Sequence, residues 1–294
     1  MSANSSTPVS SAASTPLSAA AAALPSLRAE LSELYTLKET FFPADVSVKQ
    51  ARLSELCAAL TARVASIDTT GVPSSIRSAL CFVTGRALDA LETPSPEAEA
   101  ALSRAVRLDA SSSEAWAALG HVQWKRADLD GAVESFESSI ARAPTASAHR
   151  SLASLARARL RSPSDRARVG NDELLSAHAN AITHAKAAIA LDLADAQSWD
   201  ALGLAYLCTA IEVSLDVEDL RRARTAFLRG AALAAAAGSE KHPDTSYNRG
   251  VMHSCLEEWD AAEAAFTAAV GRDPTLPGLV RPHASALRPA DPTR

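Results

Sequence analysis

The sequence predicts an all-α fold made of helical hairpins stacked side by side, and three observations support this. Residues 113–146 carry apolar side chains at helical spacing on two short segments, with a small residue, Gly120, where the segments would approach each other. The same pattern returns around Gly203. Aromatic residues make up only 4% of the 294-residue chain, which favours helices packed through alanine and leucine over a sheet-based core.

Residues 113–146 match the signature of a tetratricopeptide repeat (TPR). Trp116 and Gly120 form the W-x2-L-G half, and Ala132 and Phe136 form the A-x3-F half. A single hairpin of this kind leaves an apolar face uncovered, so it needs neighbours on both sides. We therefore expect a right-handed TPR-type α-solenoid of about five irregular hairpins with an N-terminal helical cap.

The first part of the chain divides into a tail and a cap. Residues 1–23 are rich in Ser, Ala, Thr and Pro and contain no Lys or Arg, so we expect a disordered tail and neither a secretory signal nor a mitochondrial presequence. Residues 24–70 carry leucines at three- and four-residue intervals, interrupted by Pro43. They predict two helices that cap the array, and capping units are expected to be atypical.

The array itself is expected over residues 71–280. A step of 34 residues back from Trp116 reaches Phe82, which places a degenerate first repeat before the clear one. Trp116 and Trp199 are 83 residues apart, which is two 34-residue periods plus 15 residues, so the middle repeat is enlarged. The fourth repeat carries an insertion near residues 209–216. The five repeats are expected at residues 79–112, 113–146, 147–195, 196–237 and 243–276, followed by a C-terminal tail at residues 281–294.

Composition narrows the classes of partner and compartment. The formal net charge is -5, which gives no overall attraction to nucleic acid or to anionic lipid. No apolar run approaches the roughly 18 residues of a membrane span. We therefore expect no membrane and no sequence-specific nucleic acid among the partners. The chain has four cysteines, Cys57, Cys81, Cys208 and Cys255, and none of them forms a C-x-x-C pair. We therefore expect them to be reduced core residues. Reduced cysteines indicate a cytoplasmic protein that is also nuclear in some circumstances.

No catalytic, metal or cofactor motif is visible, so we expect a protein that is not an enzyme and needs no cofactor. His178 and His184 share a helix but lie six residues apart, about 600° around its axis, and so point to different faces. We expect four other histidines to be isolated surface or groove residues: His121, His149, His242 and His253.

In a TPR array the first helices of the hairpins line a concave groove, through positions 2, 5, 6, 9, 12 and 13 of each unit. The groove predicted in this way is mixed in polarity and lightly charged, which suits a short extended peptide as ligand. The residues expected to line it are His121, Trp124, Lys125, Ser151, Leu155, Leu204, Leu207, Asp244, Tyr247 and Asn248.

One variety of TPR groove can be tested directly. Co-chaperone TPR domains hold the terminal carboxylates of Hsp70 and Hsp90 with a clamp of Lys, Asn and Arg side chains. At the corresponding places this chain has no such residues, so the clamp is expected to be absent. The residues at those places are Val83, Ala87, Ala118, Ala148 and Leu152.

Beyond the general signature, several strings resemble one family in order along the chain. They include LYTLKETFF, EAWAALGHVQWKRADLDGA, SWDALGLAYL and HPDTSYNRGVMHSCLEEWDAAEAAF. Together they are similar to the tetratricopeptide repeat protein 5 (Strap) family, from about residue 24 to residue 277, irregular spacing included. The resemblance implies a helical cap, an irregular TPR array and a C-terminal OB-fold. The chain ends at Arg294 without the OB-fold or the family's basic ribosome-docking segment.

The resemblance also implies a function. The family acts as a cytosolic adaptor that recognises the N-terminal Met-Arg-Glu segment of nascent tubulin at the ribosome and triggers decay of tubulin mRNA. Its groove arginine that faces the ligand's glutamate matches Arg157, and its aspartate that faces the ligand's arginine matches Asp244. A further acidic residue of the family is replaced by Gly278. We therefore expect a non-enzymatic peptide-binding adaptor, with the ribosome as a second partner.

Two other functions remain open at this point. The same resemblance implies a nuclear, stress-responsive scaffold for transcription or acetyltransferase complexes. A TPR array can also serve as a structural subunit of a larger assembly. For Arg157 the alternative is a solvated helix face, since three other arginines surround it in the sequence, and for Asp244 it is a helix N-cap.

Overall fold

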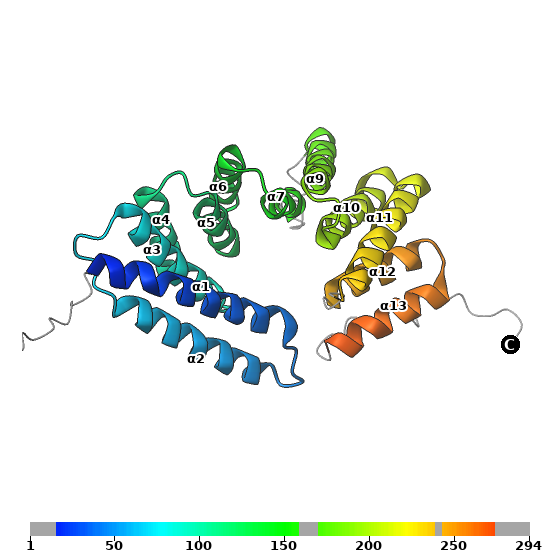
Figure 1. The fold of residues 1–294 in the computed structure, drawn as a ribbon. Coiled ribbons are helices and arrows are strands. Elements are labelled where there is room, and N and C mark those ends of the chain that lie inside the picture. The colour runs from blue at the N-terminus through cyan, green and yellow to red at the C-terminus, as the bar shows by residue number, and fades with distance from the viewer. Residues whose placement is uncertain (1–15, 159–169, 239–242, 274–294) are drawn as a thin grey trace, which may run out of the picture.

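The computed structural model describes residues 16–158, 170–238 and 243–273, and the regular structure in these ranges is helical. Figure 1 shows the helices following one another along an arch. The α-helices are α1 (Pro16–Thr40), α2 (Val46–Ala65), α3 (Ser74–Asp89), α4 (Pro96–Leu108), α5 (Ser113–Lys125), α6 (Leu129–Arg142), α7 (Ala146–Ala158), α9 (Asn171–Leu191), α10 (Ala196–Thr209), α11 (Val217–Ala236), α12 (Pro243–Cys255) and α13 (Trp259–Arg272), with a π-helix, η1 (Ala210–Ser214), after α10.

Local sequence signals explain where several of these helices begin. The side chains of Ser112, Asp128 and Asp195 each accept a hydrogen bond from a backbone N–H in the first turn of α5, α6 and α10 respectively. Such caps satisfy N–H groups that have no partner within the helix. The acidic pair Asp128 and Asp130 therefore lies at a helix start, as its position in the sequence indicates.

The helices pair as antiparallel hairpins: α3 with α4, α5 with α6, α7 with α9, α10 with α11, and α12 with α13. In three of them a glycine of the first helix lies under a phenylalanine of the second. A Cβ atom built on Gly120 would lie 3.0 Å from the Phe136 ring, and one built on Gly203 would lie 2.8 Å from the Phe227 ring. These phenylalanines are fully buried. The absence of a side chain at the glycine is thus what lets the two helices approach.

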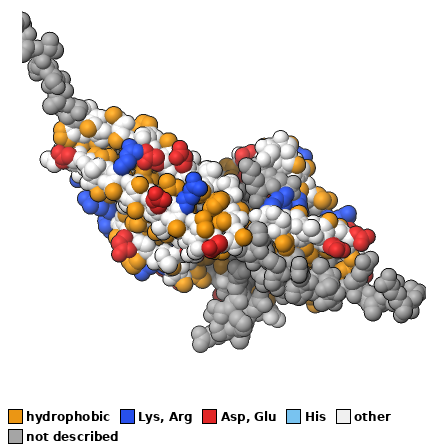
Figure 2. All heavy atoms as spheres, turned by 90° about the horizontal axis from the view of Figure 1, so that it is seen from below, with side chains coloured by type: hydrophobic (Ala, Val, Ile, Leu, Met, Phe, Trp, Pro, Cys, Tyr) orange, Lys and Arg blue, Asp and Glu red, His pale blue; other side chains and the backbone are white. Residues whose placement is uncertain are grey.

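Consecutive hairpins stack so that their first helices form one continuous surface. Helix α3 contacts α5, α5 contacts α7, α7 contacts α10, and α10 contacts α12. Helices α1 and α2 pack on each other and on α3 at the N-terminal end of the arch (Figure 1). This is the TPR-type solenoid with an N-terminal cap that the sequence predicts. Figure 2 shows acidic and basic side chains interspersed among apolar ones on the face seen from below.

The cap and the last hairpin lie at the two ends of the arch (Figure 1). Burial lowers the pKa of Lys49 on α2, and the carboxylate of Asp273, directly after α13, acts in the opposite direction. The concave side of the array is therefore bounded by the cap at one end and by the last hairpin at the other.

The N-terminal boundary differs from the sequence-based expectation. Helix α1 begins at Pro16, so residues 16–23, assigned to the tail, are helical. Alanine has the highest helix propensity, and proline is tolerated at the first helical position, so the Ala-rich run extends the helix. Ala20 is fully buried, so this extension packs against other residues.

The insertion expected near residues 209–216 is present and has a specific structure. It forms the π-helix η1 followed by Leu215, whose φ of 50° is left-handed. Some of the other expectations lie outside the described residues: the remainder of the N-terminal tail, the enlarged loop after residue 158, His242, Gly278 and the C-terminal tail at residues 281–294.

The glycine contact leads to a stability prediction. Gly203→Ala should lower the free energy of unfolding by about 1–3 kcal/mol, because the added Cβ would overlap the buried Phe227 ring. Gly271→Ala is the matched control: nothing lies within 4 Å of a Cβ there, so it should stabilise helix α13 by about 0.5 kcal/mol. Urea unfolding followed by circular dichroism measures both, and equal effects would contradict the proposed contact.

Candidate peptide-binding groove

The concave surface contains two cavities that meet at Trp124 and Ser154. The first, which we call the basic pocket, has a volume of about 480 Å³ and lies toward the N-terminal cap. It is lined by Tyr35, Lys38, Glu39, Arg86, Asp89, His121, Trp124, Lys125, Ser147, Arg150, Ser151, Ser154 and Gln197.

Helical spacing explains how these side chains converge. On α5, His121, Trp124 and Lys125 stand at positions i, i+3 and i+4, which share one face of a helix. The same spacing relates Arg86 to Asp89 on α3. The cap helix α1 contributes Tyr35, Lys38 and Glu39, so the groove extends beyond the repeats into the cap.

Asp89 is the centre of the basic pocket. Its carboxylate accepts a hydrogen bond from the Tyr35 hydroxyl at 3.1 Å and lies 3.6 Å from the Arg86 guanidinium and 3.7 Å from the Lys125 ammonium. The Lys125 ammonium also donates to the backbone carbonyls of Asp89 and Leu91. Because Asp89 is almost completely buried, these partners are what compensate its charge.

His121 is held neutral in this pocket. Its ring packs edge-to-face on Phe136, with centroids 4.9 Å apart, and its Nε2 lies 3.5 Å from the Ser151 hydroxyl. Burial, together with the nearby Arg86 guanidinium, lowers the pKa of His121 to about 4. At neutral pH the imidazole therefore adds hydrogen-bonding capacity to the pocket and no charge.

The second cavity, which we call the mixed pocket, has a volume of about 580 Å³ and lies toward the C-terminal end of the array. A shallower cavity of about 370 Å³ adjoins it and shares several of its residues, among them Arg157 and Asp244. The mixed pocket is lined by Trp124, Ser154, Arg157, Ala158, Leu204, Cys208, Glu212, Asp244, Tyr247 and Asn248.

Arg157 reaches the mixed pocket from the last turn of α7. Its Nε donates to the Ala153 carbonyl at 3.3 Å, one guanidinium nitrogen donates to the Ser154 hydroxyl at 3.1 Å, and the other lies 4.0 Å from the Cys208 sulfur. These contacts attach the guanidinium to its own helix and to α10, at the lining of the cavity.

Helix α12 supplies another part of the lining. Asp244, Tyr247 and Asn248 stand at i, i+3 and i+4, and all three line the pocket. Asp244 is exposed and lies in the first turn of the helix, where a carboxylate is favoured by the helix dipole. The Tyr247 ring lies against Phe266, with centroids 5.6 Å apart, which connects this part of the lining to the core of the last hairpin.

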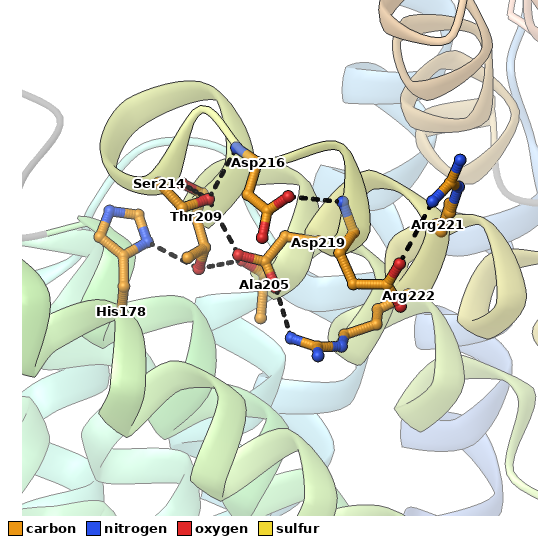
Figure 3. A network of polar contacts seen from close by, with 9 residues as sticks. His178, Ala205, Thr209, Ser214, Asp216, Asp219, Arg221 and Arg222 are labelled. Carbon is orange, nitrogen blue, oxygen red and sulfur yellow. Dashed lines mark hydrogen bonds and ion pairs between the residues drawn. The ribbon is translucent and has the colours of Figure 1, made fainter.

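The insertion supplies a further acid, Glu212 of η1. The buried His178 of α9 has its Nε2 3.3 Å from a Glu212 carboxylate oxygen and its Nδ1 3.4 Å from the Thr209 hydroxyl. Figure 3 shows this histidine facing Thr209, while Ser214 and Asp216 join η1 to the start of α11. The π-helix therefore contacts α9 through His178 and is joined to the start of α11 through Ser214 and Asp216. In this position its Glu212 lines the mixed pocket.

The structure brings together in this groove the eight site residues expected from the sequence: His121, Trp124, Lys125, Ser151, Arg157, Asp244, Tyr247 and Asn248 line one or both pockets. Leu204 also lines the mixed pocket. Two other residues expected in the groove, Leu155 and Leu207, are instead buried in the core. Asp244 is the second residue of α12 as the structure describes it, so it lies in the first turn of the helix.

A one-residue error of register explains why Leu155 is not in the groove. It does not explain Leu207, whose repeat has the predicted register but which packs in the core with Phe227 and Met252. Gly85 packs on Leu102 as Gly120 packs on Phe136, so the first helix of the first repeat is offset by 35 residues from that of the second, whereas Leu102 and Phe136 keep the offset of 34. In the third repeat, Thr145 caps α7 as Ser112 caps α5, an offset of 33. Each residue of slip turns a helix by about 100°, which exchanges groove positions for core positions.

The same slip affects the residues compared with the chaperone clamp. Those residues are buried core positions, so they could not hold a peptide carboxylate whatever their identity: Val83, Ala87, Ala118, Ala148 and Leu152. In the first and third repeats the clamp comparison therefore falls on the wrong face of the helices.

Several lining residues were missed in the sequence. Asp200 stands at the fifth position of its repeat, a groove position, and accepts a hydrogen bond from the Thr245 hydroxyl at 3.2 Å. Arg150 stands at the same position of the third repeat and is paired with Asp195. The correct register of the third repeat would have identified Arg150, whereas the register predicted for the fourth repeat already places Asp200 at a groove position. The contribution of Tyr35 and Lys38 has no such signal, because it depends on how α1 packs on α3.

The histidines are less isolated than expected. The Nδ1 atoms of His149 and His184, on facing helices α7 and α9, are 3.1 Å apart, and burial lowers the pKa of both. His253 bonds Glu258 at 2.6 Å. Within the described ranges, however, no three His, Cys, Asp or Glu side chains come together as they would around a metal ion.

Sequence comparison identifies curated relatives at moderate identity. The chain is 27% identical to tetratricopeptide repeat protein 5 of Bos taurus and 26% identical to that of Mus musculus, in each case over 258 residues, or 86% of this chain. It is 28% identical to the Homo sapiens protein over 201 residues. The chain spans about half the length of these relatives, 56% of the bovine and mouse proteins and 44% of the human one. No protein-family model matches it.

Solved structures confirm the architecture. The chain resembles a thermophilic TPR protein of Thermus thermophilus, with a TM-score of 0.55 and 22% identity over 71% of this chain and 98% of the other. It also resembles a chain of the APC/C hetero-tetramer Cut9–Hcn1, with a TM-score of 0.59 and 17% identity over 92% of this chain and 45% of the other. At these identities the likeness shows the TPR fold alone.

Membrane insertion can be considered separately. Among the described residues, no helix combines the length and the apolar composition that crossing a lipid bilayer requires.

The environment of His121 predicts a pH dependence of stability. Its pKa is about 4 in the folded chain and 6.5 in the unfolded chain, so protons bind the unfolded state first as the pH falls below 6.5. His121 should therefore remove about 1–2 kcal/mol of stability between pH 7 and pH 5. His121→Gln should lose correspondingly less over that interval in urea unfolding. The two stability curves should run parallel above pH 7.5, and parallel curves at pH 5–7 would contradict the prediction.

Proposed function

We propose that this chain is a peptide-binding adaptor that holds the N-terminal Met-Arg-Glu segment of nascent tubulin in its concave groove. The observation that carries the proposal is that a cation and an anion, Arg157 and Asp244, line one pocket from two helices, α7 and α12, that both contact α10. A ligand with adjacent opposite charges needs this arrangement. The similarity to tetratricopeptide repeat protein 5 supports the choice of ligand.

The chemistry of the pocket suits such a peptide. The Arg157 guanidinium would bind the ligand's glutamate, and the Asp244 carboxylate would bind its arginine, both through charge-assisted hydrogen bonds. Asn248 and Tyr247, beside Asp244, offer polar groups to an extended backbone, and Leu204 offers an apolar surface to the methionine. A ligand with one charge missing would form only one of the two charge-assisted contacts and should bind more weakly.

An adaptor of this kind needs no reactive group of its own. Binding of the nascent chain in the cytosol, at the ribosome, would place the array beside the translated mRNA, and decay would then be carried out by other proteins. We assign this chain the role of reading the peptide. The described residues that line the mixed pocket lie on helices α5 to α12 and on η1.

The proposal predicts that the chain binds a Met-Arg-Glu peptide with measurable affinity and that substitutions of Arg157 and Asp244 reduce this affinity. An amidated peptide that begins with Met-Arg-Glu should bind the full chain in calorimetry. Arg157→Glu and Asp244→Arg should each weaken binding by about 1.5–3 kcal/mol, the free energy of a charge-assisted hydrogen bond. Lys186→Gln, at an exposed lysine on α9 outside both pockets, is the control and should bind normally.

A charge-exchange experiment makes the test specific to these two residues. The double variant Arg157→Asp, Asp244→Arg should prefer a peptide that begins with Met-Glu-Arg over the original one. Absence of heat with the Met-Arg-Glu peptide at high micromolar concentration, with a normally folded chain, would reject the proposal.

A further inference from the structure

The basic pocket is not used by the three residues of the proposed ligand, yet it continues the same groove. It shares Trp124 and Ser154 with the mixed pocket, so a peptide can pass from one to the other without leaving the concave surface. Its lining carries four cations: Lys38, Arg86, Lys125 and Arg150. A peptide that continues past the mixed pocket therefore meets a concentrated group of positive charges.

The acids of this region do not neutralise these cations completely. Asp89 is shared between Arg86 and Lys125, and Asp195, which lies outside the pocket lining, pairs with Arg150. Glu39 is the remaining acid of the lining. Four cations against three carboxylates leave one positive charge in excess, since His121 is neutral at pH 7. The excess fits a single carboxylate better than a doubly charged group.

Among the described residues, Lys38 is the cation of this lining that forms no ion pair with a carboxylate, whereas Arg86, Lys125 and Arg150 each have one. It lies in the last turn of α1, and its ammonium makes a long hydrogen bond of 3.4 Å to the Asp89 carbonyl. Burial, with Lys125 and Arg86 nearby, lowers its pKa, although Asp89 acts in the opposite direction. An additional carboxylate would raise the pKa of Lys38, because an opposite charge favours the protonated lysine.

The proposed function also sets the direction of the peptide. If the ligand's arginine contacts Asp244 on α12 and its glutamate contacts Arg157 on α7, the residues that follow run toward α5 and α3. Neighbouring helices are about 10 Å apart, and an extended chain advances about 3.3 Å per residue. The basic pocket is therefore reached about three to six residues after the glutamate.

We propose that the basic pocket binds the carboxylate side chain of an Asp or Glu that stands three to six residues after the glutamate of the bound peptide. This inference rests on the proposed function for the direction of the peptide, and it adds a second determinant of specificity. Ligands that share the Met-Arg-Glu start would then be ranked by an acidic residue further along.

The test uses amidated peptides, so that the terminal carboxylate does not contribute. A parent peptide has Met-Arg-Glu followed by neutral residues to position 9, and a series places a single Glu, or a matched Gln, at position 6, 7, 8 or 9. At its best position Glu should bind about three- to tenfold tighter than Gln at the same position. Lys38→Gln should remove this gain and leave the affinity of the parent peptide unchanged, whereas Lys186→Gln should preserve both.

The outcomes separate the two proposals. If the parent binds but Glu gives no gain at any position, or if the gain survives Lys38→Gln, the basic pocket is not the carboxylate site and the proposed function is unaffected. If the parent does not bind, N-acetyl-glutamate N-methylamide is titrated while the indole N–H of Trp124 is followed by NMR. A saturable shift of the Trp124 signal supports the carboxylate site if it is absent with the glutamine analogue and absent in the Lys38→Gln variant. If the glutamate compound causes no shift, the carboxylate site is rejected.

Discussion

The contact between a glycine of the first helix and a bulky side chain of the second determines the geometry of this molecule. At Gly120, Gly203 and Gly250 a Cβ atom would lie 2.5–3.0 Å from a buried phenylalanine ring, so only glycine allows the observed approach. The close approach gives each hairpin a thin profile, and thin hairpins can stack with their first helices in contact. The groove is a consequence of this packing, because the side chains that line it are those pointing away from the glycine contact.

The same contact explains which parts of the site could be predicted from the sequence. In the second and last repeats the glycine and phenylalanine are present, the register is unambiguous, and the sequence places Trp124 and Asp244 on the surface where the structure has them. In the third repeat Ala153 replaces the glycine, the predicted register slips by one residue, and Leu155 is expected in the groove although it is buried. A one-residue slip does not change the predicted fold class, since every helix remains amphipathic. It does change which residues are predicted to line the groove.

Other features depend on contacts that no local pattern encodes. The Tyr35 hydroxyl donates to Asp89, 54 residues away, and this contact extends the groove onto the cap. Spacing within one helix predicts that Arg86 and Asp89 share a face, but it cannot predict that α1 lies beside them. Similarly, the length of the insertion after Thr209 is visible in the sequence, whereas the π-helix that presents Glu212 depends on its packing against His178 of α9.

The order of charges along the groove gives it a direction. Three acids, Asp244, Glu212 and Asp200, lie toward the C-terminal end with one cation, Arg249. Arg157 lies between the ends, and the excess positive charge of the basic pocket lies toward the cap. In a partly desolvated groove the interaction between charges is stronger than in water, so a peptide bound in the reverse direction would bring like charges together at both ends. Backbone hydrogen bonds and apolar contacts are less sensitive to chain direction. Electrostatic order is therefore what would select one orientation, and the residues after the first three would contribute to affinity only in that orientation.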